Sequence, residues 1–181
     1  KALGDFAIKH MDVGGEELKD PKLRRAIDSI FNRLIPKTEE LEITYRIVNN
    51  SQINAFALPG GQIVIFSGLM SQASSAEEVA GVLAHEIAHV TERHGIERMA
   101  KSLGVVATIQ LLLGDASGLL GMAKDLLTVA SINSYSRDQE READAIGVKM
   151  LHDAGISHIH LFMLRGTTHG TRSEYDQCCR Y

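Results

Sequence analysis

The chain has 181 residues, a mass of 19.8 kDa and a formal net charge of -4. This length suits one compact domain that needs no disulfide or metal staples, so we expect a single domain over residues 1–181, with its core at about 20–155. A net negative charge without any basic run argues against nucleic acid as a partner. The only two cysteines, Cys178 and Cys179, are neighbours and predict no disulfide framework.

No segment of the sequence has the length and apolarity of a membrane span. The longest apolar run, residues 103–113, is shorter than the ~20 residues that a transmembrane helix needs, and Gly114 ends it. We therefore expect a soluble protein. The chain starts at Lys1 without an initiator methionine or a signal-peptide pattern, as we expect of a mature or trimmed form.

The first predicted element is an amphipathic helix over residues 21–34. Asp20 is a suitable N-cap, Pro21 suits the first helical position and Pro36 stops the helix. The apolar residues between them recur at helical spacing, and they are Leu23, Ala26, Ile27, Ile30, Phe31 and Leu34.

Three short strands are predicted next. Residues 41–48 alternate in part and are rich in Ile, Tyr, Thr and Val, which favour strands. Residues 53–58 and 62–66 flank a Pro-Gly-Gly turn at residues 59–61. These two segments therefore predict a β-hairpin.

A helix over residues 75–94 is predicted after the hairpin. Ser75, with Glu78 three residues later, is a capping box, and the helix is expected to end near His94. Its apolar face consists of Val79, Val82, Leu83, Ile87 and Val90.

Three further helical stretches follow, at residues 96–113, 118–132 and 136–154. Core packing is the simpler interpretation of the first two, which are apolar. The other interpretation is a hydrophobic hairpin that leans on a membrane or covers a cleft. The elements together predict a mainly helical α+β fold.

The central motif is His85-Glu86-Ile87-Ala88-His89, in the middle of a predicted helix. Its four-residue spacing places both imidazoles on one helix face, about one turn apart, where both can bind one Zn²⁺ ion. Glu86 lies beside the open position of such an ion, where it can take a proton from a water whose pKa zinc lowers towards ~7. The motif therefore predicts a catalytic site with one zinc ion per chain.

A catalytic zinc site needs a third protein ligand. The metzincin pattern has a Gly three residues after the second His and a third His three residues later, but this chain has Glu92 and Gly95 at those positions. His94 is out of register with that pattern. We interpret it as a helix-end residue, with a direct role at the metal as the lesser alternative.

A pair of acidic residues on the last predicted helix offers a better third ligand. Glu140 and Asp144 share a helix face, so the first can bind zinc while the second accepts the N–H of a ligating imidazole. The competing interpretation is a solvated acidic helix start paired with Arg137 and Arg141. Glu142 stays as the rival ligand, although its spacing from Asp144 separates their faces.

With these motifs the chain resembles the HtpX and CAAX prenyl endopeptidase family of gluzincin metallopeptidases, particularly its soluble bacterial members. The resemblance lies in residues 54–61, 83–90 and 136–145. In that family the third ligand is the Glu four residues before a supporting Asp, which selects Glu140 and Asp144. The resemblance implies a zincin-like domain with a small sheet or hairpin beside the active-site helix.

The resemblance also implies a substrate-binding edge strand next to that helix. Its candidate residues are Asn54, Ala55, Phe56 and Ala57. Their main-chain groups would pair with an extended peptide with little regard for its sequence. An ordinary buried hairpin is the simpler interpretation, and both can hold at once.

The chain departs from the family in residues 156–181, which form an atypical tail. Family members carry a His-Pro segment followed by an Arg near the C-terminus, and here only the surroundings of His169 resemble it faintly. The donor that stabilises the tetrahedral oxyanion is therefore left open, and the candidates are His169, Tyr135 and Tyr175. His158 and His160 are interpreted as surface histidines, with a second metal site as the alternative.

The expected function is a zinc-dependent metalloendopeptidase that acts on extended or unfolded polypeptides. The resemblance to the soluble bacterial branch implies quality control of envelope proteins, in the periplasm or peripherally at a membrane. The alternatives are a chaperone-like zinc module that binds peptides without cutting them, and a structural zinc site with four protein ligands. Glu86 argues against both, because neither needs that carboxylate. The sequence predicts no oligomeric state.

Overall fold

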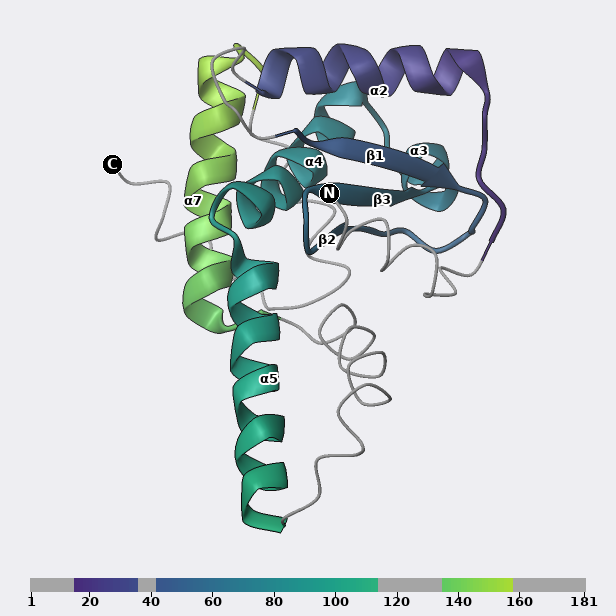
Figure 1. Cartoon of the computed structure of the whole chain (residues 1–181). Helices are drawn as coiled ribbons and strands as arrows, with labels where there is room; N and C mark the ends of the chain where they lie inside the picture. The colour runs from purple at the N-terminus through teal and green to yellow at the C-terminus, as the bar shows by residue number, and fades with distance from the viewer. Residues whose placement is uncertain (1–14, 36–41, 114–134, 158–181) are drawn as a thin grey trace.

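The computed structural model describes residues 15–35, 42–113 and 135–157 (Figure 1). The elements within these ranges are α2 (Pro21–Leu34), β1 (Thr44–Val48), β2 (Ala55–Leu58), β3 (Gln62–Phe66), α3 (Ser67–Gln72), α4 (Ala76–Thr91), α5 (His94–Leu113) and α7 (Arg137–Asp153). Helices dominate and the strands form one small sheet, so the predicted α+β class is confirmed. The helix predicted over residues 118–132 lies outside the described residues.

The strands form a mixed sheet in the order β1-β3-β2. β2 and β3 make the predicted antiparallel hairpin, in which Ala57 lies opposite Ile63. Gly60 and Gly61 have φ angles of 102° and 89° in the connecting turn, a conformation that residues with side chains disfavour. Because β1 pairs in parallel with the other side of β3, β2 forms one edge of the described sheet.

Both faces of the sheet are buried, as the two-residue period of a strand allows. One face packs into the main core around α4, through Ile47, Ala55, Ala57, Ile63 and Ile65. The opposite face forms a smaller cluster of Val48, Leu58, Val64 and Phe66. Because the β2 residues that face α4 are alanines, the edge strand lies close to that helix.

Helix α4 is the centre of the fold. It contacts α2, α7, β2 and β3, and all of residues 83–90 are buried. Ser75 caps its N-terminus as predicted, because Ser75 Oγ accepts a hydrogen bond of 3.3 Å from the N–H of Glu78. The predicted capping box is not complete, since the Glu78 carboxylate accepts from the N–H of Ser74 at 2.7 Å instead of from Ser75.

The helix predicted over residues 75–94 is interrupted near its end. α4 ends at Thr91, and Arg93 has a left-handed backbone with a φ angle of 58°. His94 therefore begins α5, which runs in a new direction, and does not end α4 as predicted (Figure 1). The short helix α3, directly after β3, was not predicted either.

Helices α4 and α7 approach each other closely at Gly147. A Cβ atom on Gly147 would lie 3.2 Å from the backbone nitrogen of His85 and 3.4 Å from the carbonyl carbon of Ala84. Ala143, about one turn earlier on α7, is also buried. Small residues on α7 therefore permit the short distance between the two helices.

We expect Gly147→Val to lower the free energy of unfolding by about 1–3 kcal/mol, because the added side chain forces α7 away from α4. Urea unfolding measures this change. Gly104→Ala on α5 is the control, since an added Cβ there would have no neighbour within 4 Å among the described residues. It should be neutral or slightly stabilising. Equal stability of Gly147→Val and the wild type would contradict this account of the helix contact.

Helix α5 runs away from the sheet and from α2 (Figure 1). The side chains of residues 105–113 lie outside the described part of the chain. The choice between core packing and a membrane-facing or cleft-covering hairpin therefore stays a prediction. Within the described ranges, no helix is long and apolar enough to cross a membrane.

Candidate metal centre

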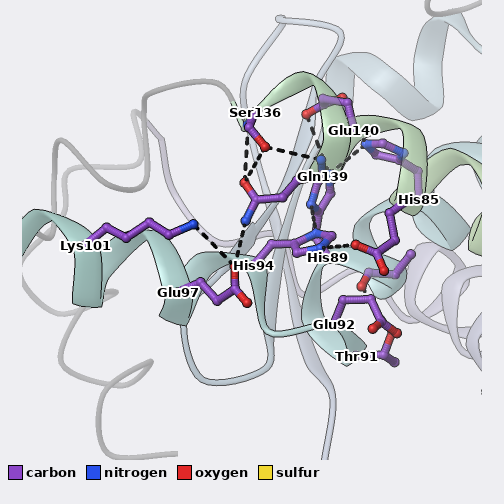
Figure 2. A network of polar contacts seen from close by, with 12 residues as sticks. His85, His89, Thr91, Glu92, His94, Glu97, Lys101, Ser136, Gln139 and Glu140 are labelled. Carbon is purple, nitrogen blue, oxygen red and sulfur yellow. Dashed lines mark hydrogen bonds and ion pairs between the residues drawn. The ribbon is translucent and has the colours of Figure 1, made fainter.

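Two imidazoles and one carboxylate meet between α4 and α7. His85 and His89 lie one turn apart on α4, and their Nε2 atoms are 2.9 Å apart. Carboxylate oxygens of Glu140, in the first turn of α7, lie 3.7 Å from Nε2 of His85 and 3.7 Å from Nε2 of His89. Figure 2 shows these side chains close together. Their ligand atoms lie within 4.8 Å of one another and can share one metal ion.

Asp144 on α7 lies beside the His85 ring. Its Oδ1 lies 2.9 Å from Nδ1 of His85. A carboxylate at this distance favours the tautomer with the proton on Nδ1, which leaves the Nε2 lone pair for a metal. Imidazole nitrogens bind zinc at ~2.0–2.1 Å, so two nitrogens 2.9 Å apart are close enough to bind the same ion. This donor set fits zinc.

The start of α7 is held in place by a capping box. Ser136 Oγ accepts from the N–H of Gln139 at 3.3 Å, and Gln139 Oε1 accepts from the N–H of Ser136 at 3.2 Å. The amide nitrogen of Gln139 also donates to Glu97 on α5 at 3.2 Å (Figure 2). These bonds fix the first turn of α7, and Glu140 with it, relative to α5.

Glu86 connects the metal centre to the edge strand. Its side chain is buried, and its Oε2 accepts a hydrogen bond of 2.8 Å from the N–H of Ala57. The N–H of Phe66 on β3 donates to the carbonyl of Asn54. In an antiparallel pair, every second residue forms hydrogen bonds with the partner strand. The N–H and C=O groups of Ala55 and Ala57 therefore point away from β3. The predicted base and the predicted substrate strand are therefore adjacent.

His94 lies beside His89, which the sequence did not predict. Their Nδ1 atoms are 3.0 Å apart, and His94 is buried. In a continuous helix, residues five apart point about 140° away from each other. The left-handed conformation of Arg93 ends the helix between them, and the His94 ring therefore reaches the His89 ring. Glu142, the rival ligand, places its Oε2 3.2 Å from Nε2 of His94, outside the three-residue cluster.

Tyr135 covers one face of the His89 ring. The two ring centroids are 3.7 Å apart with an interplanar angle of 15°, and Cζ of Arg98 lies 4.3 Å from the centroid of the tyrosine ring. Burial raises the pKa of Tyr135 to about 12; the negative charge of Glu86 adds to the rise and Arg98 opposes it. The phenol is therefore protonated at neutral pH and can donate a hydrogen bond. Tyr135 stays a candidate oxyanion donor.

A cavity of about 250 Å³ opens next to His89. The end of β2, the hairpin turn and the start of α5 line it, through Ala57, Leu58, Pro59, Gly60, Gly61, His89, Val90, Arg93, Gly95, Ile96 and Tyr135. Because it includes both the edge strand and a residue of the metal centre, it offers room for part of a ligand beside the site.

Several residues singled out in the sequence lie outside the described residues. They are His158, His160, His169, Tyr175, Cys178 and Cys179. The second metal site, two of the three oxyanion donors and most of the atypical tail therefore stay predictions.

A donor set of two histidines and one glutamate is typical of catalytic zinc sites in peptidases. The sequence matches the model of peptidase family M48 over residues 17–171. The chain belongs to peptidase family M48, which confirms the resemblance found in its motifs.

Named relatives agree with this membership. The beta-barrel assembly-enhancing protease of Yersinia pestis is 34% identical over 167 residues, which cover 86% of this chain and 34% of that protein. The metalloprotease YcaL of Escherichia coli (strain K12) is 32% identical over 162 residues, or 87% of this chain and 63% of YcaL. The mitochondrial metalloendopeptidase OMA1 of Arabidopsis thaliana is 39% identical over 60% of this chain and 22% of its own length. This chain thus spans about a third of the first relative.

Proposed function

We propose that the chain is a zinc-dependent metalloendopeptidase that cuts extended or unfolded polypeptides. The convergence of His85, His89 and Glu140 next to Glu86 carries this proposal. The family implies a metal cofactor, and two imidazoles with one carboxylate suit zinc. In the proposal these three residues hold one ion per chain, and Asp144 orients His85.

When bound, zinc supplies a Lewis acid that lowers the pKa of water towards ~7. Glu86 is the proposed general base, which takes a proton from the attacking water and returns it to the leaving amine. Its hydrogen bond with the N–H of Ala57 holds the carboxylate at the edge strand. Three protein ligands would leave one position of a zinc ion open, as in catalytic zinc sites and unlike closed structural sites.

The edge of β2 is the proposed peptide-binding surface. Ala55 and Ala57 turn their main-chain groups away from β3, and the N–H of Ala57 donates to Glu86. Within the described ranges no further strand pairs with this edge. An extended peptide can add here as a new strand, through main-chain hydrogen bonds that depend little on its sequence. The cavity beside His89 gives room for one of its side chains. These features suit an unfolded substrate.

We expect Ala55→Pro to lower kcat/KM for an unfolded protein by about 10-fold. Proline has no N–H, so a hydrogen bond from residue 55 to a substrate carbonyl would be lost. Proline is tolerated on edge strands, so the hairpin should persist. Ala55→Gly keeps the N–H and is the control. Both variants should bind as much zinc as the wild type. Unchanged cleavage by Ala55→Pro would contradict peptide binding at this edge.

For the biological role we propose quality control of envelope proteins in a bacterium, in the periplasm or at a membrane surface. The support is the similarity to a beta-barrel assembly-enhancing protease and to the metalloprotease YcaL.

The proposed activity is tested by incubating the zinc-loaded chain with casein, with and without a chelator. Cleavage that the chelator stops supports the peptidase. Bound zinc and bound but uncut casein would support the chaperone-like module instead.

A further inference from the structure

Two residues outside the metal cluster extend from His89 to the surface: His94 contacts His89, and Glu142 contacts His94. We propose that they form a positioning relay, in which Glu142 fixes the proton of His94, and His94 fixes the proton of His89. The relay orients the His89 ring with the lone pair of Nε2 towards the cluster and so increases the affinity for zinc. This inference rests on the proposed function.

The geometry of the relay is continuous from solvent to the metal centre. Nε2 of His94 lies 3.2 Å from Oε2 of Glu142, and its Nδ1 lies 3.0 Å from Nδ1 of His89. The side chain of Glu142 is 54% exposed, whereas His94 is 2% exposed. The two rings therefore meet where water competes little, and only the carboxylate at the outer end reaches solvent.

The carboxylate determines the direction of both hydrogen bonds. Glu142 can only accept, so Nε2 of a neutral His94 carries the proton and its Nδ1 carries the lone pair. Nδ1 of His89 must then donate to that lone pair. A neutral imidazole has one N–H, so Nε2 of His89 keeps a lone pair directed at the cluster.

The relay gives His89 the same kind of support that His85 receives directly. Asp144 on α7 contacts Nδ1 of His85 at 2.9 Å, whereas Glu142 on the same helix contacts His94. Ligating histidines usually donate their second N–H to a carboxylate or a carbonyl, which orients the ring and raises its basicity. Through His94, the carboxylate of Glu142 thus orients His89.

The test is the zinc affinity of purified variants, measured by competition with a chelator of known affinity. His94→Leu fills a similar volume without hydrogen bonds and should weaken zinc binding about 10–100-fold, the range typical of outer partners. His94→Asn keeps an acceptor for the N–H of His89 and should remain within about 3-fold of the wild type. Glu142→Ala should weaken binding about 10-fold.

Asp138→Ala is the matched control, because Asp138 is an exposed acidic residue on the same helix that pairs with Arg141 instead of with the relay. It should bind zinc like the wild type. Since Glu142 is on the surface, Glu142→Ala should fold normally and carries the test if His94→Leu does not fold, as checked by circular dichroism.

Two results would overturn the relay while leaving the proposed function intact. One is a wild-type zinc affinity in Glu142→Ala. The other is equal weakening by His94→Asn and His94→Leu, which would indicate packing alone. A wild-type chain that binds no zinc would instead overturn the relay and the proposed function together.

Discussion

Glu86→Gln is expected to lower the rate of casein cleavage by at least about 100-fold while the chain still binds one zinc ion. A positioned general base contributes about 10²–10⁴-fold, and glutamine cannot take a proton from water. Its amide oxygen can still accept from the N–H of Ala57, so the local structure should persist. Cleavage kinetics and metal analysis of the same samples measure both effects.

Glu78→Gln is the matched control for this experiment. Glu78 is another buried glutamate on α4, and its carboxylate accepts from the N–H of Ser74, away from the metal centre. It removes the same charge from the same helix and should leave kcat unchanged. Normal cleavage by Glu86→Gln with zinc bound would exclude Glu86 as the base.

Glu140→Ala is expected to weaken zinc binding by more than about 100-fold, beyond the ~10–100-fold typical of residues that only support a ligand. Cleavage should fall with zinc occupancy. A chelator should produce the same loss in the wild type, and added zinc should restore activity there but much less in the variant. Zinc titrations followed by casein cleavage measure this difference.

Asp138→Ala again serves as the control, because Asp138 lies in the same first turn of α7 and is exposed. It should keep both zinc and activity. The decisive comparison is between Glu140→Ala and Glu142→Ala. If the second abolished zinc binding and the first did not, Glu142 would be the ligand and the proposed site would be wrong.

Elements with local signals were predictable from the sequence. The start of α2 follows from Asp20 and Pro21 and its end from Pro36, and the β2–β3 hairpin follows from its Pro-Gly-Gly turn. The His85–His89 pair was equally local, because four-residue spacing on a helix dictates a shared face. Glu140 needed the family resemblance as well, since it comes from a separate helix and an acidic helix start is common on solvated surfaces.

Contacts that depend on tertiary packing were not predictable. No residue pattern marks the left-handed Arg93, yet that residue ends α4 early and brings His94 to His89. The hydrogen bond from Ala57 to Glu86 likewise depends on how closely β2 approaches α4. The contact of His94 with His89 supports the relay, and the hydrogen bond from Ala57 supports the placement of Glu86 as the base. Neither contact could be inferred from the spacing of the motif alone.

The most direct test of the proposed zinc site is a crystal structure of the zinc-loaded chain, with anomalous diffraction recorded at the zinc absorption edge. We predict one anomalous peak per chain, ligated by Nε2 of His85, Nε2 of His89 and the carboxylate of Glu140, with one position left for water. A peak with a fourth protein ligand, a peak bound by Glu142 in place of Glu140, or no peak between α4 and α7 would contradict the proposed site.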